Sequence, residues 1–135
     1  MTFILVGVDQ VRANVGRHLG YAPEIIVSQH QLDEFTHATG TPGHDGYMAL
    51  SLSNLFLPKI VEIQGFEMGV NYGCEAVRFG SPVTAGARVR AGALLQSATD
   101  VPGGLQTLMV ITVEILSAES TSGCACTIES LSRWY

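Results

Sequence analysis

The sequence predicts an α+β fold in which an antiparallel sheet wraps around one central helix. Residues 46–57 contain no charged side chain, which is typical of a helix enclosed by the rest of the protein. Residues 88–95 instead alternate, with charged side chains at 88 and 90 and apolar side chains at 89, 91, 93 and 95, as in a strand with one buried face. One apolar helix followed by a series of extended stretches indicates α+β architecture.

The size and composition favour one domain that associates with a partner. The chain has 135 residues, so we expect a single domain over residues 1–135. Hydrophobic residues make up 47% and charged residues 14%, against a usual charged fraction of about 25%. This composition excludes a disordered tail, and we expect the surplus apolar surface to form a subunit interface. The net charge is −5 without a Lys/Arg cluster, so no nucleic-acid partner is expected.

The N-terminal residues and the cysteines favour a cytoplasmic protein. The first eight residues hold a short apolar run with no basic residue before it, unlike a secretory signal, and no apolar run is long enough to span a membrane. An odd number of cysteines suits a reducing compartment. Cys124 and Cys126 are expected on one face of a strand as small buried side chains. A metal-binding pair is the alternative, although no other ligand stands at suitable spacing, and we expect no metal or cofactor.

The remaining elements follow from local signals in chain order. Asp9 is expected to cap a helix over 10–16, and residues 24–27 form a short strand. Ser28 and Gln31 have the spacing of a capping box, which opens a helix that ends at Thr39-Gly40. Asp45 is expected to cap the central helix, and Pro58 to stop it. Further strands are expected over 60–66, 69–79, 88–95, 109–115 and 124–133, with a turn at 100–104.

Four blocks in order resemble the MaoC-like branch of the hot-dog superfamily, whose best-known members are (R)-specific enoyl-CoA hydratases. They are F-T-H-A-T-G at 35–40, G-Y-M-A-L-S-L at 46–52, N-Y-G at 71–73 followed by V-R-F and P-V, and I-E-S-L-S-R-W-Y at 128–135. The resemblance implies a hot-dog fold and an acyl thioester of CoA or acyl carrier protein as the ligand. It also implies a homodimer, or a heterodimer with another hot-dog subunit. No membrane partner is expected, because the sequence has no apolar run long enough to span a membrane.

The sequence departs from the resembled family where that family carries its catalytic motif, T-G-D-x-x-x-x-H. The family's Asp and His activate water for addition to an enoyl thioester, and the reverse reaction is dehydration. Such chemistry needs one group to remove a proton and another to return one. Here Thr41 follows Thr39-Gly40, and only residues 41–44 precede Asp45, so the catalytic segment is shortened.

The candidate site therefore consists of residues near the start of the central helix. His44 and Asp45 are candidate catalytic residues, as a relocated acid–base pair; alternatively, Asp45 caps the helix and His44 is a loop residue. The resemblance implies that the Gly46 N–H is the oxyanion donor, whereas packing alone would also explain a glycine. Ser51 matches a family serine near the substrate, or it bonds to its own helical turn. Tyr47 is expected in the pocket wall or the core.

Three functions remain open from the sequence. The first is a divergent hydratase or dehydratase with altered chemistry on an acyl thioester, in a lipid or polyketide-like pathway. The second is a non-catalytic subunit whose partner carries the intact Asp/His pair. The third is a binding protein that uses the acyl cavity as a receptor. The sequence leaves open whether the chain is catalytic alone.

Overall fold

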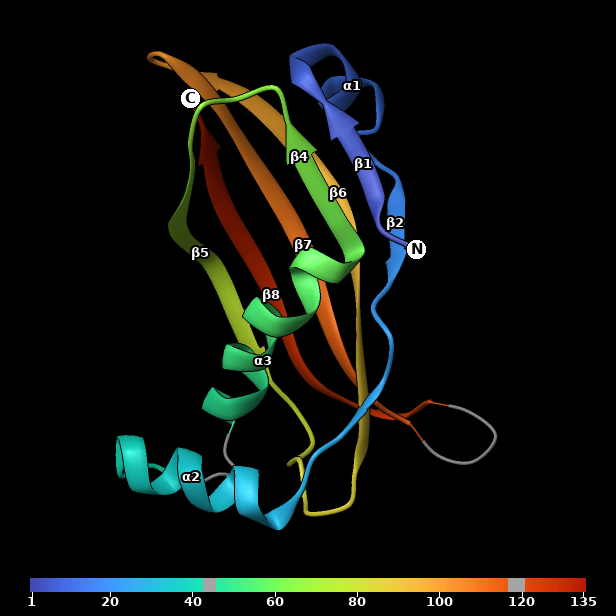
Figure 1. Ribbon diagram of the computed structural model, residues 1–135, viewed down its shortest axis with the longest axis vertical. Coiled ribbons are helices and arrows are strands. Elements are labelled where there is room, and N and C mark those ends of the chain that lie inside the picture. Colours follow the sequence, from blue (N-terminus) through green and yellow to red (C-terminus); the bar gives the residue numbers. More distant parts are fainter. Residues whose placement is uncertain (43–45, 117–120) are drawn as a thin grey trace.

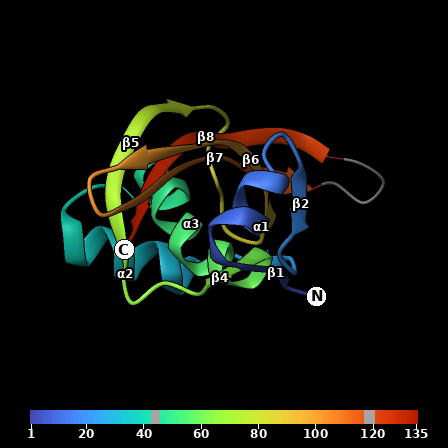
Figure 2. The ribbon, with the colours of Figure 1, turned by 90° about the horizontal axis from the view of Figure 1, so that it is seen from above.

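A computed structural model describes residues 1–42, 46–116 and 121–135, and it confirms the predicted α+β architecture. A six-stranded sheet curves around helix α3 (Gly46–Ile60), as Figures 1 and 2 show. The strands of the sheet are, in spatial order, β2 (His18–Tyr21), β6 (Arg88–Val101), β7 (Gly104–Leu116), β8 (Thr121–Trp134) and β5 (Gly69–Phe79), with β3 (Ile25–Ile26) added to β6. All of these pairings are antiparallel.

A separate two-stranded sheet corrects the prediction that every strand after residue 60 joins one antiparallel sheet. Strand β4 (Val61–Gln64) pairs in parallel with β1 (Phe3–Val6), a strand that the sequence reading missed. Because β4 follows α3 directly, it begins on the helix side of the main sheet, where Figure 2 shows β1 and β4 lying. The N-terminal strand therefore supplies the backbone hydrogen bonds that β4 needs.

The two shorter helices follow their capping signals to different degrees. Helix α2 (Gln29–Thr39) has the predicted capping box: the Ser28 Oγ accepts from the Gln31 N–H at 3.1 Å, and the Gln31 side chain accepts from the Ser28 N–H at 2.9 Å. Gly40 ends α2 with a left-handed φ of 73°. Helix α1 (Gly7–Ala13) begins earlier than predicted, with Asp9 in its first turn instead of at its cap.

Helix α3 corrects two predictions about the central helix. It continues to Ile60, so Pro58 lies in its last turn; the ring removes one helical hydrogen bond, to the Asn54 carbonyl, where the helix is about to end. The expectation that protein surrounds α3 on every side is also wrong. Met48, Ala49, Phe56 and Ile60 are buried, whereas the opposite face is exposed, because the sheet covers only one side of the helix.

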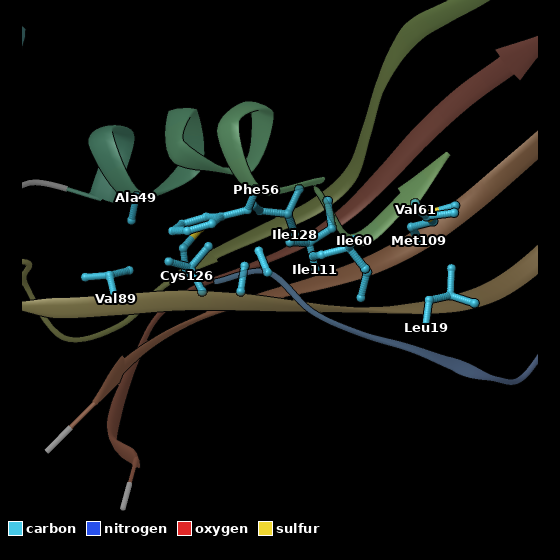
Figure 3. Close-up of a cluster of buried hydrophobic side chains, with 14 of the residues drawn as sticks. Leu19, Ala49, Phe56, Ile60, Val61, Val89, Met109, Ile111, Cys126 and Ile128 are labelled. Carbon is cyan, nitrogen blue, oxygen red and sulfur yellow. The ribbon is translucent and has the colours of Figure 1, made fainter. Parts of the chain in front are cut away.

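The core lies between the buried face of α3 and the inner face of β6, β7 and β8. Figure 3 shows Phe56, which has no exposed surface, directed toward sheet residues that include Ile111, Cys126 and Ile128. Burial raises the pKa of the Cys126 thiol to about 11, with further contributions from Cys124 and Cys74.

The cysteine prediction holds for Cys126 alone. Cys74 and Cys124 are exposed. A bulge in β8 pairs Cys126 with Val113 but Cys124 with the next residue of β7, Glu114, so the strict alternation that would place both thiols on one face is lost. None of the helices in the described ranges is long and apolar enough to cross a membrane.

Candidate functional site

A groove of about 280 Å³ runs between α3 and the inner face of β8 and β5. It forms because α3 packs chiefly against β6, β7 and β8, while β5 lies at the edge of the sheet beyond β8. Leu50, Asn54 and Leu57 line the helix side at the spacing of one helical face. The floor and far wall consist of Asn71, Cys74, Ile111, Ile128, Ser130 and Ser132.

The sheet side of the groove begins where the inward residues of β8 change from apolar to polar. Successive inward positions are Cys126, Ile128, Ser130 and Ser132, of which the first two are buried and the last two half-buried. Asn71 on β5 lies opposite Ser132 in the antiparallel ladder. The groove therefore has a polar wall directly beside the hydrophobic core.

An apolar cavity of about 300 Å³ adjoins the groove at the C-terminal end of α3. The two spaces share Leu57, Ser130 and Ser132. The remaining lining of the apolar cavity comprises Pro58, Val61, Glu62, Ile63, Met109 and Trp134. The indole Nε1–H of Trp134 donates to the Thr107 Oγ1 at 3.0 Å, which fixes the indole orientation at this end.

A third cavity, of about 300 Å³, lies at the N-terminal end of α3 and contains two of the predicted binding residues. Tyr47 and Ser51 line it together with Phe35, Thr39 and Thr41, and Ser51 also lines the groove. Tyr47 is 57% exposed, so it forms a cavity wall and is not part of the core. The Ser51 hydroxyl donates to the Tyr47 carbonyl at 2.8 Å, as in the structural alternative for this serine.

Gly46 stands at the first position of α3, against the ring of Phe79 from β5. A Cβ built on Gly46 would overlap that ring, so packing alone favours glycine here. The Gly46 N–H belongs to the first turn of α3, where the helix dipole favours negative charge. The place of Gly46 thus suits both interpretations, packing and oxyanion binding.

The predicted catalytic pair, His44 and Asp45, lies outside the described residues and stays a prediction. Within the described ranges, no three His, Cys, Asp or Glu side chains form a group that could hold a metal ion. The sequence reading missed the polar groove residues Asn54, Asn71, Ser130 and Ser132. The sequence feature that marks them is the break in the apolar alternation of β8 at residues 130 and 132. Its place beside Asn71 becomes visible only from the register between β5 and β8.

Comparison with known proteins gives two relatives over most of the chain. The 3-hydroxyacyl-thioester dehydratase Z of Mycobacterium tuberculosis is 29% identical, covering 94% of this chain and 95% of that protein. Its 147 aligned positions exceed the 135 residues here, so the relative has residues that this chain lacks. Nodulation protein N of Rhizobium leguminosarum is 35% identical over 131 residues, 78% of each chain. No family model matches.

Several solved structures share the fold. A monoamine oxidase regulatory protein from Archaeoglobus superposes with a TM-score of 0.69 at 15% identity, over 98% of this chain and 97% of that one. A MaoC-like dehydratase from Rhodospirillum rubrum gives a TM-score of 0.61 at 10% identity, over 90% and 92% of the two chains. At these identities the likeness concerns the fold, and it confirms the predicted hot-dog architecture.

Proposed function

Because this chain belongs to the MaoC-like dehydratase family of hot-dog proteins, we propose that it acts on an acyl thioester as a divergent hydratase or dehydratase. The observation that carries the proposal is the series of three adjoining cavities along α3. The series begins beside Tyr47 and Ser51 near the helix N-terminus and ends at Trp134. A thioester group at the first cavity would have its acyl chain directed along the groove. The carrier, in this proposal, is CoA or an acyl carrier protein.

The reaction proposed is loss of water from a 3-hydroxyacyl thioester, or its reverse. A base removes a proton from Cα, negative charge develops on the thioester oxygen, and the hydroxyl leaves from the neighbouring carbon as water after receiving a proton. The Gly46 N–H would stabilise the developing oxyanion at the start of α3. His44 and Asp45, which precede Gly46 in the sequence, are proposed as the acid–base groups in place of the family's longer segment.

The test is a turnover assay with purified protein. Hydration of crotonyl-CoA and of longer enoyl-CoA thioesters is followed by loss of enoyl-thioester absorbance. His44→Ala should lower kcat/KM by about 10²–10⁴, as expected for loss of a general acid or base. His30→Ala is the matched control, since His30 is exposed on α2 and pairs with Glu34 at 2.8 Å. Absence of turnover with every chain length would contradict the catalytic proposal. Turnover that His44→Ala leaves unchanged would contradict the proposed role of His44.

A second candidate function is favoured by the exposed edge strand β5. Val70, Tyr72 and Phe79 on this strand are exposed, and β5 pairs only with β8 among the described strands. We propose that another hot-dog subunit pairs here, either a second copy or a MaoC-like chain with an intact T-G-D-x-x-x-x-H motif. In the second case this chain would complete the partner's site without catalysis of its own.

Co-expression with such a partner separates the two candidates. A subunit role predicts a stable heteromer whose hydratase activity exceeds that of the partner alone. A stable homodimer of this chain that hydrates enoyl thioesters by itself would count against it. Tyr72→Glu, which places a charge on β5, should weaken either assembly, and the equivalent change at the exposed Tyr21 on β2 serves as the control.

A further inference from the structure

Four polar side chains in the groove have no hydrogen-bonding partner among the described residues. They are Asn54 on α3, Asn71 on β5, and Ser130 and Ser132 on β8. Two other serines of the groove differ, because their hydroxyls are already used by the helix. Ser51 donates to the Tyr47 carbonyl at 2.8 Å, and Ser53 donates to the Leu50 carbonyl at 2.6 Å. The four unpaired side chains are therefore available to a ligand.

These four side chains line the groove from both sides, and Ser130 and Ser132 also line the adjoining apolar cavity. Asn71 and Ser132 are cross-strand partners, and Ser130 is the preceding inward position of β8. Asn54 belongs to the helix wall opposite, between Leu50 and Leu57. Amide and hydroxyl groups both donate and accept hydrogen bonds. A purely alkyl chain here would remove them from water without replacing those bonds, which weakens binding.

The end of the path beside Trp134 differs from the groove. Beyond Leu57 the lining becomes mostly apolar and ends at the fixed indole of Trp134. Among the described residues, no Lys or Arg lines the groove or the apolar cavity, and Glu62 borders the latter. A carboxylate or phosphate on the chain would thus meet no positive partner and one negative charge.

From this pattern we infer that the groove selects an acyl chain carrying neutral oxygen substituents, hydroxyl or oxo groups, along its middle and an apolar terminus. This inference rests on the proposed acyl-thioester function and names the substrate class within it. Asn54, Asn71, Ser130 and Ser132 are the specificity-determining residues, since they contact the oxygen substituents and not the thioester. The apolar terminus occupies the cavity beside Trp134.

Binding measurements test the inference independently of turnover. The probes are two pantetheine thioesters of equal chain length, one saturated and one hydroxylated along its middle carbons. Trp134 is the single tryptophan of the sequence, so its fluorescence reports occupancy of the far end, while calorimetry gives Kd. The native protein should bind the hydroxylated thioester about tenfold more tightly, the upper range for one net hydrogen bond.

Substitutions then assign the preference to the groove. Asn54→Leu combined with Ser130→Ala removes two of the four polar groups and should reduce the tenfold preference, while the saturated thioester binds as tightly as before or more tightly. Ser97→Ala, at a half-buried serine of β6 outside the groove, should leave the preference unchanged. Circular dichroism checks that each variant is folded.

The outcomes separate the two levels of the proposal. Equal or tighter binding of the saturated thioester by the native protein overturns the inference but leaves the proposed acyl-thioester function standing. A preference that is undiminished in the double variant also overturns the inference. Failure of both thioesters to bind overturns the proposed function together with it.

Discussion

The inner face of the sheet meets helix α3 in two different ways. Against Ile111 of β7 and against Cys126 and Ile128 of β8, Phe56 packs into a closed apolar cluster. Toward β5, the same strand β8 presents Ser130 and Ser132 to an open groove. Helix α3 and strand β8 therefore contribute to both regions. The lining changes from apolar to polar between two successive inward positions of β8, Ile128 and Ser130.

This difference separates what holds the fold from what is available for binding. Close packing in the core means that each methylene group removed leaves a cavity. The polar side chains Asn54, Asn71, Ser130 and Ser132 of the groove are exposed or half-buried and have unused hydrogen-bonding groups, so their removal costs the fold little. The two regions should accordingly respond in opposite ways to substitution. Substitutions in the core should lower stability without changing ligand specificity, and substitutions of the polar groove residues should change specificity without lowering stability.

The largest effect is expected for Phe56→Ala in the core. Deleting a fully buried ring should lower the free energy of unfolding by about 3–5 kcal/mol. Urea denaturation measures the change, and Leu55→Ala, at the exposed neighbouring residue, is the control with an expected cost within about 0.5 kcal/mol. Equal costs at both positions would mean that α3 does not have one buried and one open face.

Cysteines provide a natural probe in each region, since Cys126 lies in the core and Cys74 lines the groove. Burial raises the pKa of the Cys126 thiol to about 11, so a smaller fraction of it is thiolate at neutral pH than of an exposed cysteine. Labelling with a thiol reagent followed by mass spectrometry should modify Cys74 and Cys124 rapidly and Cys126 only on unfolding. Rapid labelling of Cys126 in the folded protein would contradict the closed core.

The same shift gives a pH dependence of stability. Below pH 9 the thiol is protonated in both states, whereas between pH 9 and about 11 it ionises in the unfolded chain but not in the folded one. The free energy of unfolding should therefore fall as pH rises through this window. In Cys126→Ala the decline should be smaller, and an unchanged decline would show that other groups cause it.

A smaller effect is expected where α3 and β5 touch, at Gly46 and Phe79. Gly46→Ala forces the Phe79 ring aside and should cost about 1–3 kcal/mol of stability, as for other overpacking substitutions. Phe79→Ala removes the obstruction, so the double variant should be more stable than the sum of the single effects predicts. Additive costs in a double-mutant cycle would show that the two residues do not compete for space.

The core region follows from sequence patterns, but the groove does not. Three local sequence features identified β6, α2 and α3. They are the alternation at 89–95, the capping box of Ser28 and Gln31, and the charge-free run from Gly46. The pairing of β4 with β1, the bulge beside Cys124 and the partnership of Asn71 with Ser132 depend on register between distant segments. Local patterns do not encode such register, so the groove could be found only from the structure.

The smallest effect on stability is expected for Ser130→Ala in the groove. Ser130 follows Ile128 on the inner face of β8, yet its hydroxyl has no partner among the described residues, so its removal breaks no hydrogen bond of the fold. The free energy of unfolding should change by no more than about 0.5 kcal/mol, against about 2–5 kcal/mol for Ile128→Ala one step away. Urea denaturation of both variants gives the comparison directly. A cost above about 1 kcal/mol for Ser130→Ala would show that this serine supports the fold, and the boundary between the core and the groove would then lie beyond Ser130, toward Ser132.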